Sequence, residues 1–259
     1  MRTRQWMMAG IMLAVMTAMT SCEISKVRVI TDGGEMVTQI RPLKGFEEIE
    51  ISGSPTVVYQ QADSFSVKVE GPSEQVKNIL TSVNGSVLNI RNRGKIGIIN
   101  ISSGDGGTVV YVSSPDLTAV RLSGSGDFIS ERRVDTDKMQ IELRGSGDIR
   151  FSDIICDQCS TMLVGSGDLS LDHLDAQTSD VVLIGSGDIN IAESRVRKTD
   201  IQLRGSGDIV VDFQDGCGRA ECQVSGSGDI SLRGRLKSYN YSKFGSGDID
   251  IDGLVVGNQ

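Results

Sequence analysis

The stretch Leu183–Ile191, with the sequence LIGSGDINI, carries the motif that decides the fold. Gly-Ser-Gly-Asp occurs seven times in the second half of the chain, and successive copies lie 19 to 21 residues apart. A motif that returns at a nearly constant spacing indicates one small supersecondary unit stacked on copies of itself. The aspartates of the seven copies are Asp127, Asp148, Asp168, Asp188, Asp208, Asp229 and Asp248.

Apolar residues return at fixed positions of this repeat. The residue after each aspartate is apolar, and so is the residue two further on, except for Ser130. Alternating pairs such as Ile141 and Leu143 precede the glycines, and a third apolar position falls between the strands, at Ala176 and Val196. Strands with one buried face and three inward positions in about 20 residues predict an all-β parallel β-helix. The connections are too short for the crossover helices of a doubly wound α/β sheet.

The N-terminus has the pattern of a bacterial lipoprotein signal. Arg2 and Arg4 precede a short apolar run that ends in small residues at Ser21, and Cys22 follows directly. We therefore expect an exported protein, lipid-anchored through Cys22 to the cell envelope at the outer membrane, on its periplasmic or surface side. The predicted division is a signal peptide over 1–21, a tether over 22–43, and one solenoid domain over 44–259, with irregular N-terminal coils over 44–122 and regular repeats over 123–259.

Four further cysteines form two closely spaced pairs, Cys156 with Cys159 and Cys217 with Cys222. Such spacing alone would suggest a four-thiolate zinc site. In a stacked repeat, however, the pairs lie three coils apart, roughly 14 Å at the spacing between strands, and one tetrahedral metal cannot span that distance. Local disulfides and buried thiols both remain open, and we favour buried thiols that fill core positions.

Composition argues against nucleic-acid binding and against catalysis. Without Arg2 and Arg4 of the signal peptide, 24 basic and 34 acidic residues give a net charge of −10, and no basic stripe interrupts this acidic background. The one histidine, His173, is expected to be a solvated surface side chain on a turn. Acidic residues recur evenly instead of gathering with aromatic residues, as they would in a carbohydrate-active enzyme built on a β-helix. We therefore expect no enzymatic activity and no cofactor.

The seven motif aspartates are expected to stack into a column, the Asp ladder. Stacked carboxylates repel, so they must be solvated, hydrogen-bonded to neighbouring coils or neutralised by cations. Calcium-binding β-rolls use two facing turns for each ion, whereas each coil here supplies one such turn. We expect a structural, hydrogen-bonded ladder without bound metal, and keep a calcium-binding solenoid as the alternative.

Two adjacent coils break the polar pattern of the strand that precedes the corner. The outward positions of that strand are mostly polar, but these two coils place Met162 with Val164, and then Val182 with Ile184, at those positions. The four apolar side chains, bordered by Arg144 and Arg204, form a candidate interaction patch. The partner would be a protein, a polysaccharide or a second copy of the chain, unless the N-terminal part or the tether folds over the patch.

Three short segments and the repeats together resemble a known family. The segments are Phe46-Glu47-Glu48-Ile49, Val109 with Tyr111, and Pro115-Asp116-Leu117. With the Gly-Ser-Gly-Asp repeats they resemble the auto-transporter adhesin head GIN domain family, over about residues 44–252. The resemblance implies a secreted or lipid-anchored β-solenoid of the Bacteroidetes type, and a non-catalytic adhesin that binds another macromolecule or itself. It supplies no catalytic residues to assign to this chain.

Overall fold

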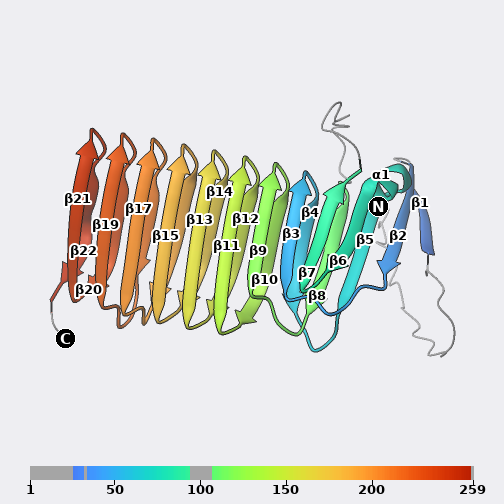
Figure 1. Cartoon of the computed structure of the whole chain (residues 1–259), viewed down its shortest axis with the longest axis horizontal. Helices are drawn as coiled ribbons and strands as arrows, with labels where there is room; N and C mark the ends of the chain where they lie inside the picture. Colours follow the sequence, from blue (N-terminus) through green and yellow to red (C-terminus); the bar gives the residue numbers. More distant parts are fainter. Residues whose placement is uncertain (1–25, 32–33, 94–106, 258–259) are drawn as a thin grey trace, which may run out of the picture.

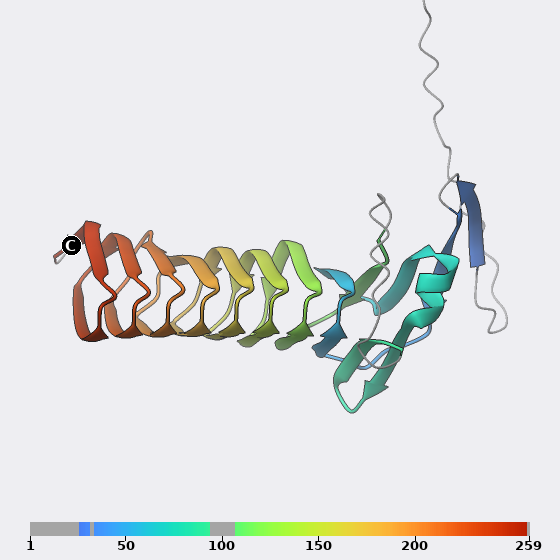
Figure 2. The ribbon, with the colours of Figure 1, turned by 90° about the horizontal axis from the view of Figure 1, so that it is seen from above.

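The computed structural model describes residues 26–31, 34–93 and 107–257, so the predicted signal peptide and Cys22 lie outside the described residues. Within these ranges the chain forms an elongated solenoid, whose coils stack along one axis (Figure 1, Figure 2). Each regular coil contributes one strand to each of two sheets, with the Gly-Ser-Gly-Asp corner between them. We call the twelve-stranded sheet, which receives the strand after the corner, sheet A, and the ten-stranded sheet, which receives the strand before it, sheet B.

The strands of each sheet follow one another in space along the solenoid axis. In this spatial order, sheet B contains β21 (Ser238–Gly245), β19 (Arg219–Gly226), β17 (Lys198–Gly205), β15 (Thr178–Gly185), β13 (Gln158–Gly165), β11 (Lys138–Gly145), β9 (Ala119–Gly124), β3 (Glu48–Gly53), β7 (Val87–Asn92) and β6 (Ile79–Asn84). Sheet A contains β1 (Lys26–Thr31), β2 (Gly34–Arg41), β5 (Ser66–Pro72), β8 (Val109–Ser114), β4 (Thr56–Gln61), β10 (Asp127–Asp135), β12 (Asp148–Ile155), β14 (Asp168–Asp175), β16 (Asp188–Ser194), β18 (Ile209–Phe213), β20 (Ile230–Leu236) and β22 (Ile249–Val256).

The repeats stack in register, as the constant spacing predicts. From β9 onward every strand pair is parallel, and equivalent motif residues lie side by side: Gly145 pairs with both Gly124 and Gly165. Between the sheets, the three inward positions of each coil form continuous buried columns, including Ile141, Phe151 and Val196. The predicted parallel β-helix is therefore confirmed. The exception at Ser130 is also buried, and its hydroxyl donates to the carbonyl oxygen of Arg132, where β10 bulges against β12.

The two glycines of each corner are required because adjacent coils approach closely there. Gly185 has φ +136°, and a Cβ atom on it would lie 2.1 Å from the carbonyl oxygen of Gly165. A Cβ atom on Gly187 would lie 2.0 Å from the carbonyl oxygen of Gly167. Either distance is a steric clash, so any larger residue would push neighbouring coils apart.

The N-terminal part departs from simple coils. Strands β3 and β4 form one coil of the stack, in parallel with β9 and β10. Beyond this coil, β1, β2, β5 and β8 are joined by antiparallel pairs, and β6 and β7 form an antiparallel hairpin. Helix α1 (Ser73–Asn78) buries Val76 in this region. The segment expected to be a tether, 22–43, contains two strands, and β2 pairs along its length with β5.

The C-terminal coil leaves this end of the described stack open. Lys243 on β21 pairs with Val224 on β19, at a position that is apolar in the preceding coils, but its side chain is exposed and its ammonium lies 3.1 Å from Asp248 Oδ1. Tyr241, Phe244 and Val255 are also exposed on the last two strands.

Candidate functional site

The four apolar residues of the candidate patch lie side by side on the outer face of sheet B. Met162 on β13 pairs with Val182 on β15, and Val164 pairs with Ile184. Their neighbours along each strand, such as Leu163 and Leu183, point inward and are fully buried. Ile184 is 37% exposed, and the other three are half-buried. We call these four residues the apolar strip.

Arginines border the apolar strip on both sides in the same row. Arg144 on β11 pairs with Val164, and Arg204 on β17 pairs with Ile184, and both arginines are exposed. The guanidinium of Arg144 forms an ion pair with Glu142, and Arg204 Nη2 donates to Gln202 Oε1 over 3.3 Å. An apolar centre with a charged rim is the usual anatomy of a protein contact surface.

The described chain leaves the apolar strip uncovered. The N-terminal strands and α1 lie at one end of the solenoid, beyond β3 and β7, and not over the face that β11 to β17 present (Figure 1, Figure 2). The alternative that the N-terminal part folds over the patch therefore does not hold for residues 26–31, 34–93 and 107–257. The exposure of Ile184 agrees with this arrangement.

The rest of this face carries charged residues in two further rows. Nearest the start of the strands lies a basic row, which contains Lys138, Lys198 and Arg219, with the neutral Gln158 and Thr178 between Lys138 and Lys198. The next outward row, which we call the acidic row, contains Asp180, Asp200 and Glu221. Lys198 links the two rows, because its ammonium lies 2.6 Å from Asp200 Oδ2 and 3.7 Å from Glu221 Oε2. A shallow groove follows these rows from Glu48 on β3 to Asp200 on β17.

The Asp ladder is tied to the backbone of the adjacent coils. Asp148 Oδ1 accepts a hydrogen bond of 3.1 Å from the backbone N–H of Asp168, and the same bond is repeated from Asp208 to Asp188, from Asp229 to Asp208 and from Asp248 to Asp229. Within the described ranges, no cluster of three or more His, Cys, Asp or Glu side chains is arranged to hold a metal ion. These hydrogen bonds link the side chain of one corner to the backbone of the next.

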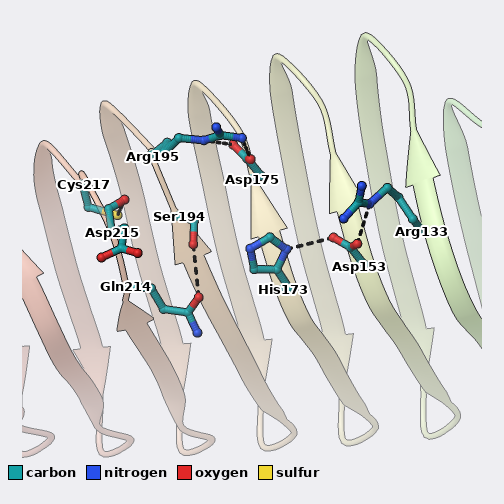
Figure 3. A network of polar contacts seen from close by, with 9 residues as sticks. All are labelled: Arg133, Asp153, His173, Asp175, Ser194, Arg195, Gln214, Asp215 and Cys217. Atoms are coloured by element: carbon teal, nitrogen blue, oxygen red, sulfur yellow. Dashed lines mark hydrogen bonds and ion pairs between the residues drawn. The ribbon is translucent and has the colours of Figure 1, made fainter.

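A polar network on the sheet A side of the coils contains the one histidine (Figure 3). His173 Nδ1 lies 2.8 Å from Asp153 Oδ1, and Arg133 Nε donates to Asp153 Oδ2 over 2.6 Å. Partial burial opposes ionisation, but the hydrogen bonds from His173 and Arg133 lower the pKa of Asp153 overall. The expectation of a surface side chain on a turn is only partly met: the ring of His173 is half exposed, but the residue lies within β14 and its ring contacts Asp153 of the preceding coil. Further along, Arg195 pairs with Asp175, and Ser194 donates to Gln214.

A buried carboxyl group inside the solenoid was missed by sequence reasoning. Glu193 on β16 is fully buried and pairs with Leu174 on one side and Phe213 on the other. Thr199 Oγ1 donates to Glu193 Oε2, whereas Glu193 Oε1 and Ser179 Oγ have no hydrogen-bond partner of normal geometry. Burial raises the pKa of Glu193 to about 7, although the nearby hydroxyls of Ser179 and Thr199 oppose the shift. The carboxyl group is therefore best accommodated with its proton.

The four internal cysteines line the same core. Cys156, Cys159, Cys217 and Cys222 are all buried and present as free thiols. Burial raises the pKa of Cys222 to about 12 and that of Cys217 to about 11. Cys217 and Cys222 are therefore poor nucleophiles and behave as small apolar side chains, whereas a hydrogen bond with Cys159 lowers the pKa of Cys156. Their positions agree with the favoured interpretation of core filling.

The fold and the site define a class: a two-sheet β-solenoid with a continuous packed core, a hydrogen-bonded corner ladder and a flat outer face that carries an apolar strip. No helix in the described ranges has the length and apolar character needed to cross a membrane. The family described as "Putative auto-transporter adhesin, head GIN domain" matches residues 45–216. The chain belongs to this head GIN domain family, which confirms the resemblance seen in the sequence.

Solved structures share the fold. A "putative adhesin" from Bacteroides fragilis superposes with a TM-score of 0.73 at 23% identity, over 85% of this chain and 97% of that one. A "putative lipid binding protein" from Parabacteroides distasonis gives 0.62 at 21% identity, over 86% and 98%. A "putative adhesin" from the same species gives 0.61 at 19% identity, over 86% and 98%. A search of curated proteins finds no match.

Proposed function

We propose that this chain is a non-catalytic, lipid-anchored adhesin of the cell envelope, and that the outer face of sheet B is its contact surface. The observation that carries the proposal is the apolar strip: Met162, Val164, Val182 and Ile184 lie together, accessible and bordered by arginines, on a face whose other rows are polar. Apolar side chains that no part of the described chain covers on a rigid, flat sheet favour contact with another macromolecule.

The chemistry of the remaining polar groups supports a non-catalytic role. His173 is engaged with Asp153, and the Asp ladder is engaged with the backbone of neighbouring corners. The side chain of Glu193 is fully buried, and the four cysteines are at most 7% exposed. A catalytic site needs an accessible acid, base or nucleophile beside a bound substrate. Lys198 and Asp200, which lie in the groove, instead form an ion pair with each other.

The anchor is proposed at Cys22, outside the described residues. The signal-like sequence before it supports lipidation, and membership of an adhesin family supports an envelope location at the outer membrane. A solenoid that is tethered at its N-terminal end would extend its long faces away from the membrane. The outer face of sheet B would then be available to a protein, a polysaccharide or a second copy of the chain.

The proposal is tested by attachment of cells that express either the native protein or a double variant, Val182→Ser with Ile184→Lys. The surfaces are coated with mucin, with collagen, or with cells of the same strain. A matched control, Gln223→Ser with Ser225→Lys, changes the same two rows on β19, away from the apolar strip. We expect native and control cells to attach to at least one surface, and strip-variant cells to lose that attachment at equal protein levels.

The melting temperatures of the purified proteins complete this test. Val182 and Ile184 point outward, so the double variant should melt within a few degrees of the native protein. Attachment of strip-variant cells at the native level would refute the strip as the contact surface. Absence of native attachment to all three surfaces would refute the adhesin role on them.

A further inference from the structure

We propose that the apolar strip docks onto the same strip of a second copy of the chain, with the two solenoid axes parallel. The inference rests on the proposed function, because it names the partner for the same contact face. The proposed dimer follows from the order of the rows on that face. This order is self-complementary when the two-fold axis runs parallel to the solenoid axis, and not when it runs parallel to the strands.

The outward residues of one coil run in a fixed chemical order. Along the strand direction, a basic row is followed by the acidic row, then by the two rows that contain the apolar strip, and then by the exposed serines of the corner, after which the chain enters sheet A. In the coil of β17 these outward residues are Lys198, Asp200, Gln202, Arg204 and Ser206. The apolar strip therefore lies between the acidic row and the corner.

A two-fold axis parallel to the solenoid and centred on the apolar strip exchanges the rows pairwise. Val164 then packs on Met162 of the second copy, and Ile184 packs on Val182. Arg144 faces Glu142 of the second copy, and Arg204 faces Gln202. The acidic row approaches the corner serines, whose hydroxyl groups can donate to its carboxylates, and the basic row lies beyond the edge of the second copy's sheet B, so no like charges meet.

The other in-plane two-fold axis, parallel to the strands, produces a conflict. It reverses the order of the strands, so that Arg144 lies over Arg204 of the second copy and both ends of the strip face like charges. Like-charge contacts within an interface oppose association.

The contact area is sufficient for a dimer of modest affinity. The two-fold axis lies near the ends of the strands, so the two sheets overlap over about five residues of each strand, or about 16 Å; the eight strands from β3 to β21 span about 38 Å, and the overlap buries roughly 600 Å² on each copy. The total of about 1,200 Å² is at the lower end of the range for specific interfaces. Parallel axes also place both N-terminal ends on the same side, so two copies anchored in one membrane can form this dimer.

The oligomeric state of the mature chain tests the inference. Cys22→Ala removes the lipid, and sedimentation equilibrium is measured from about 1 to 300 μM, a range that resolves micromolar association. We expect a concentration-dependent dimer, and a monomer for the double variant Val182→Ser with Ile184→Lys. Val210→Lys, on the outward side of sheet A, is the control and should dimerise normally.

A charge exchange determines the orientation. Arg144→Glu places two carboxylates opposite each other in the parallel dimer, and should weaken association by about tenfold or more. Adding Glu142→Arg should restore it, because the exchange keeps opposite charges across the axis. Stronger association of Arg144→Glu alone would mean that residue 144 faces Arg204, and would overturn the parallel dimer.

The outcomes for the dimer and for the proposed function are separable. A native chain that is monomeric throughout the concentration range overturns the dimer, even if the strip variant still abolishes attachment of cells. If the double variant Val182→Ser with Ile184→Lys still dimerises, the proposed interface through the apolar strip is overturned as well. Dimerisation without attachment to any coated surface would retain the dimer and refute adhesion to those surfaces.

Discussion

Replacing the buried Glu193 should change how the stability of the solenoid depends on pH. Glu193 occupies an inward position that holds Leu174 in the preceding coil and Phe213 in the next. Burial raises its pKa from 4.5 to about 7. The folded state therefore keeps the proton to a higher pH than the unfolded state does.

The sign and size of the effect follow from this difference. Because the folded pKa is the higher one, the stabilising contribution is fully present below about pH 4.5 and is lost as the pH rises through 7. A shift of about 2.5 units corresponds to roughly 3 kcal/mol of unfolding free energy across that interval. Glu193→Leu, which restores the residue type of the preceding coil, should remove this loss.

The assay is urea unfolding of the mature chain at several pH values from 5 to 8. We expect Glu193→Leu to become more stable relative to the native protein by about 3 kcal/mol between pH 5 and pH 8. Glu221→Gln, at an exposed position, is the control and should show no such trend. Parallel pH profiles for the native protein and Glu193→Leu would refute the placement of an ionisable carboxyl group in this core.

Three further predictions concern the anchor and the corners. Cys22→Ala should release the mature protein from the membrane fraction without unfolding it; fractionation with the membrane would refute the lipid anchor. Asp188→Ala should cost about 1 kcal/mol, because the backbone N–H of Asp208 loses its acceptor at an exposed site, and a chelator should leave the native melting temperature unchanged; a large drop that calcium reverses would instead show a metal-dependent ladder. Gly187→Ala should cost more than about 3 kcal/mol, because its Cβ atom would lie 2.0 Å from the carbonyl oxygen of Gly167; denaturation should show little change for the control Ser186→Ala, and equal stabilities would refute the close stacking.

The sequence predicts the stacked part of the fold well, because each repeat contains the residues that determine its corner and its buried face. The glycines fix the corner, and the alternation of side chains fixes which residues point inward. The apolar strip was also predictable. Successive side chains of a strand point to opposite faces, so a buried Leu163 places its neighbours Met162 and Val164 on the outer face. The same reasoning predicts that Val182 and Ile184 lie beside them, because the two coils have equal length.

The N-terminal strands were harder to predict for a physical reason. Residues 44–122 lack the repeat, and their pairing is set by contacts between distant segments, such as β2 with β5 and β5 with β8. The alternation of apolar residues indicates strands but does not encode their partners or direction. Antiparallel pairing and the inclusion of β2 in sheet A therefore appear only in the structure.

Two residues were misplaced or missed for different reasons. Counting from Asp188 places Glu193 at the outward position that His173 occupies in the preceding coil. However, β16 is one residue shorter than β14, and the turn after β16 contains one additional residue, Arg195, with φ +59°. Glu193 is thereby shifted inward. His173, in contrast, had a usable signal, because it stands five residues after its motif aspartate, as Asp153 does in the coil before.

Oxidation of Met162 by dilute peroxide tests most directly whether the outer face of sheet B is a contact surface. Met162 lies on the apolar strip, and Met139, 2% exposed in the core, is the internal reference. An accessible methionine is oxidised to the sulfoxide readily, whereas a buried one is protected. We predict that Met162 reacts much faster than Met139 in dilute purified protein, and is protected in native protein on attached cells or at concentrations that favour association. Two results would contradict a contact surface at this strip. One is fast oxidation of Met162 at the same rate in dilute protein, in concentrated protein and on attached cells; the other is oxidation of Met162 in dilute protein that is as slow as that of Met139.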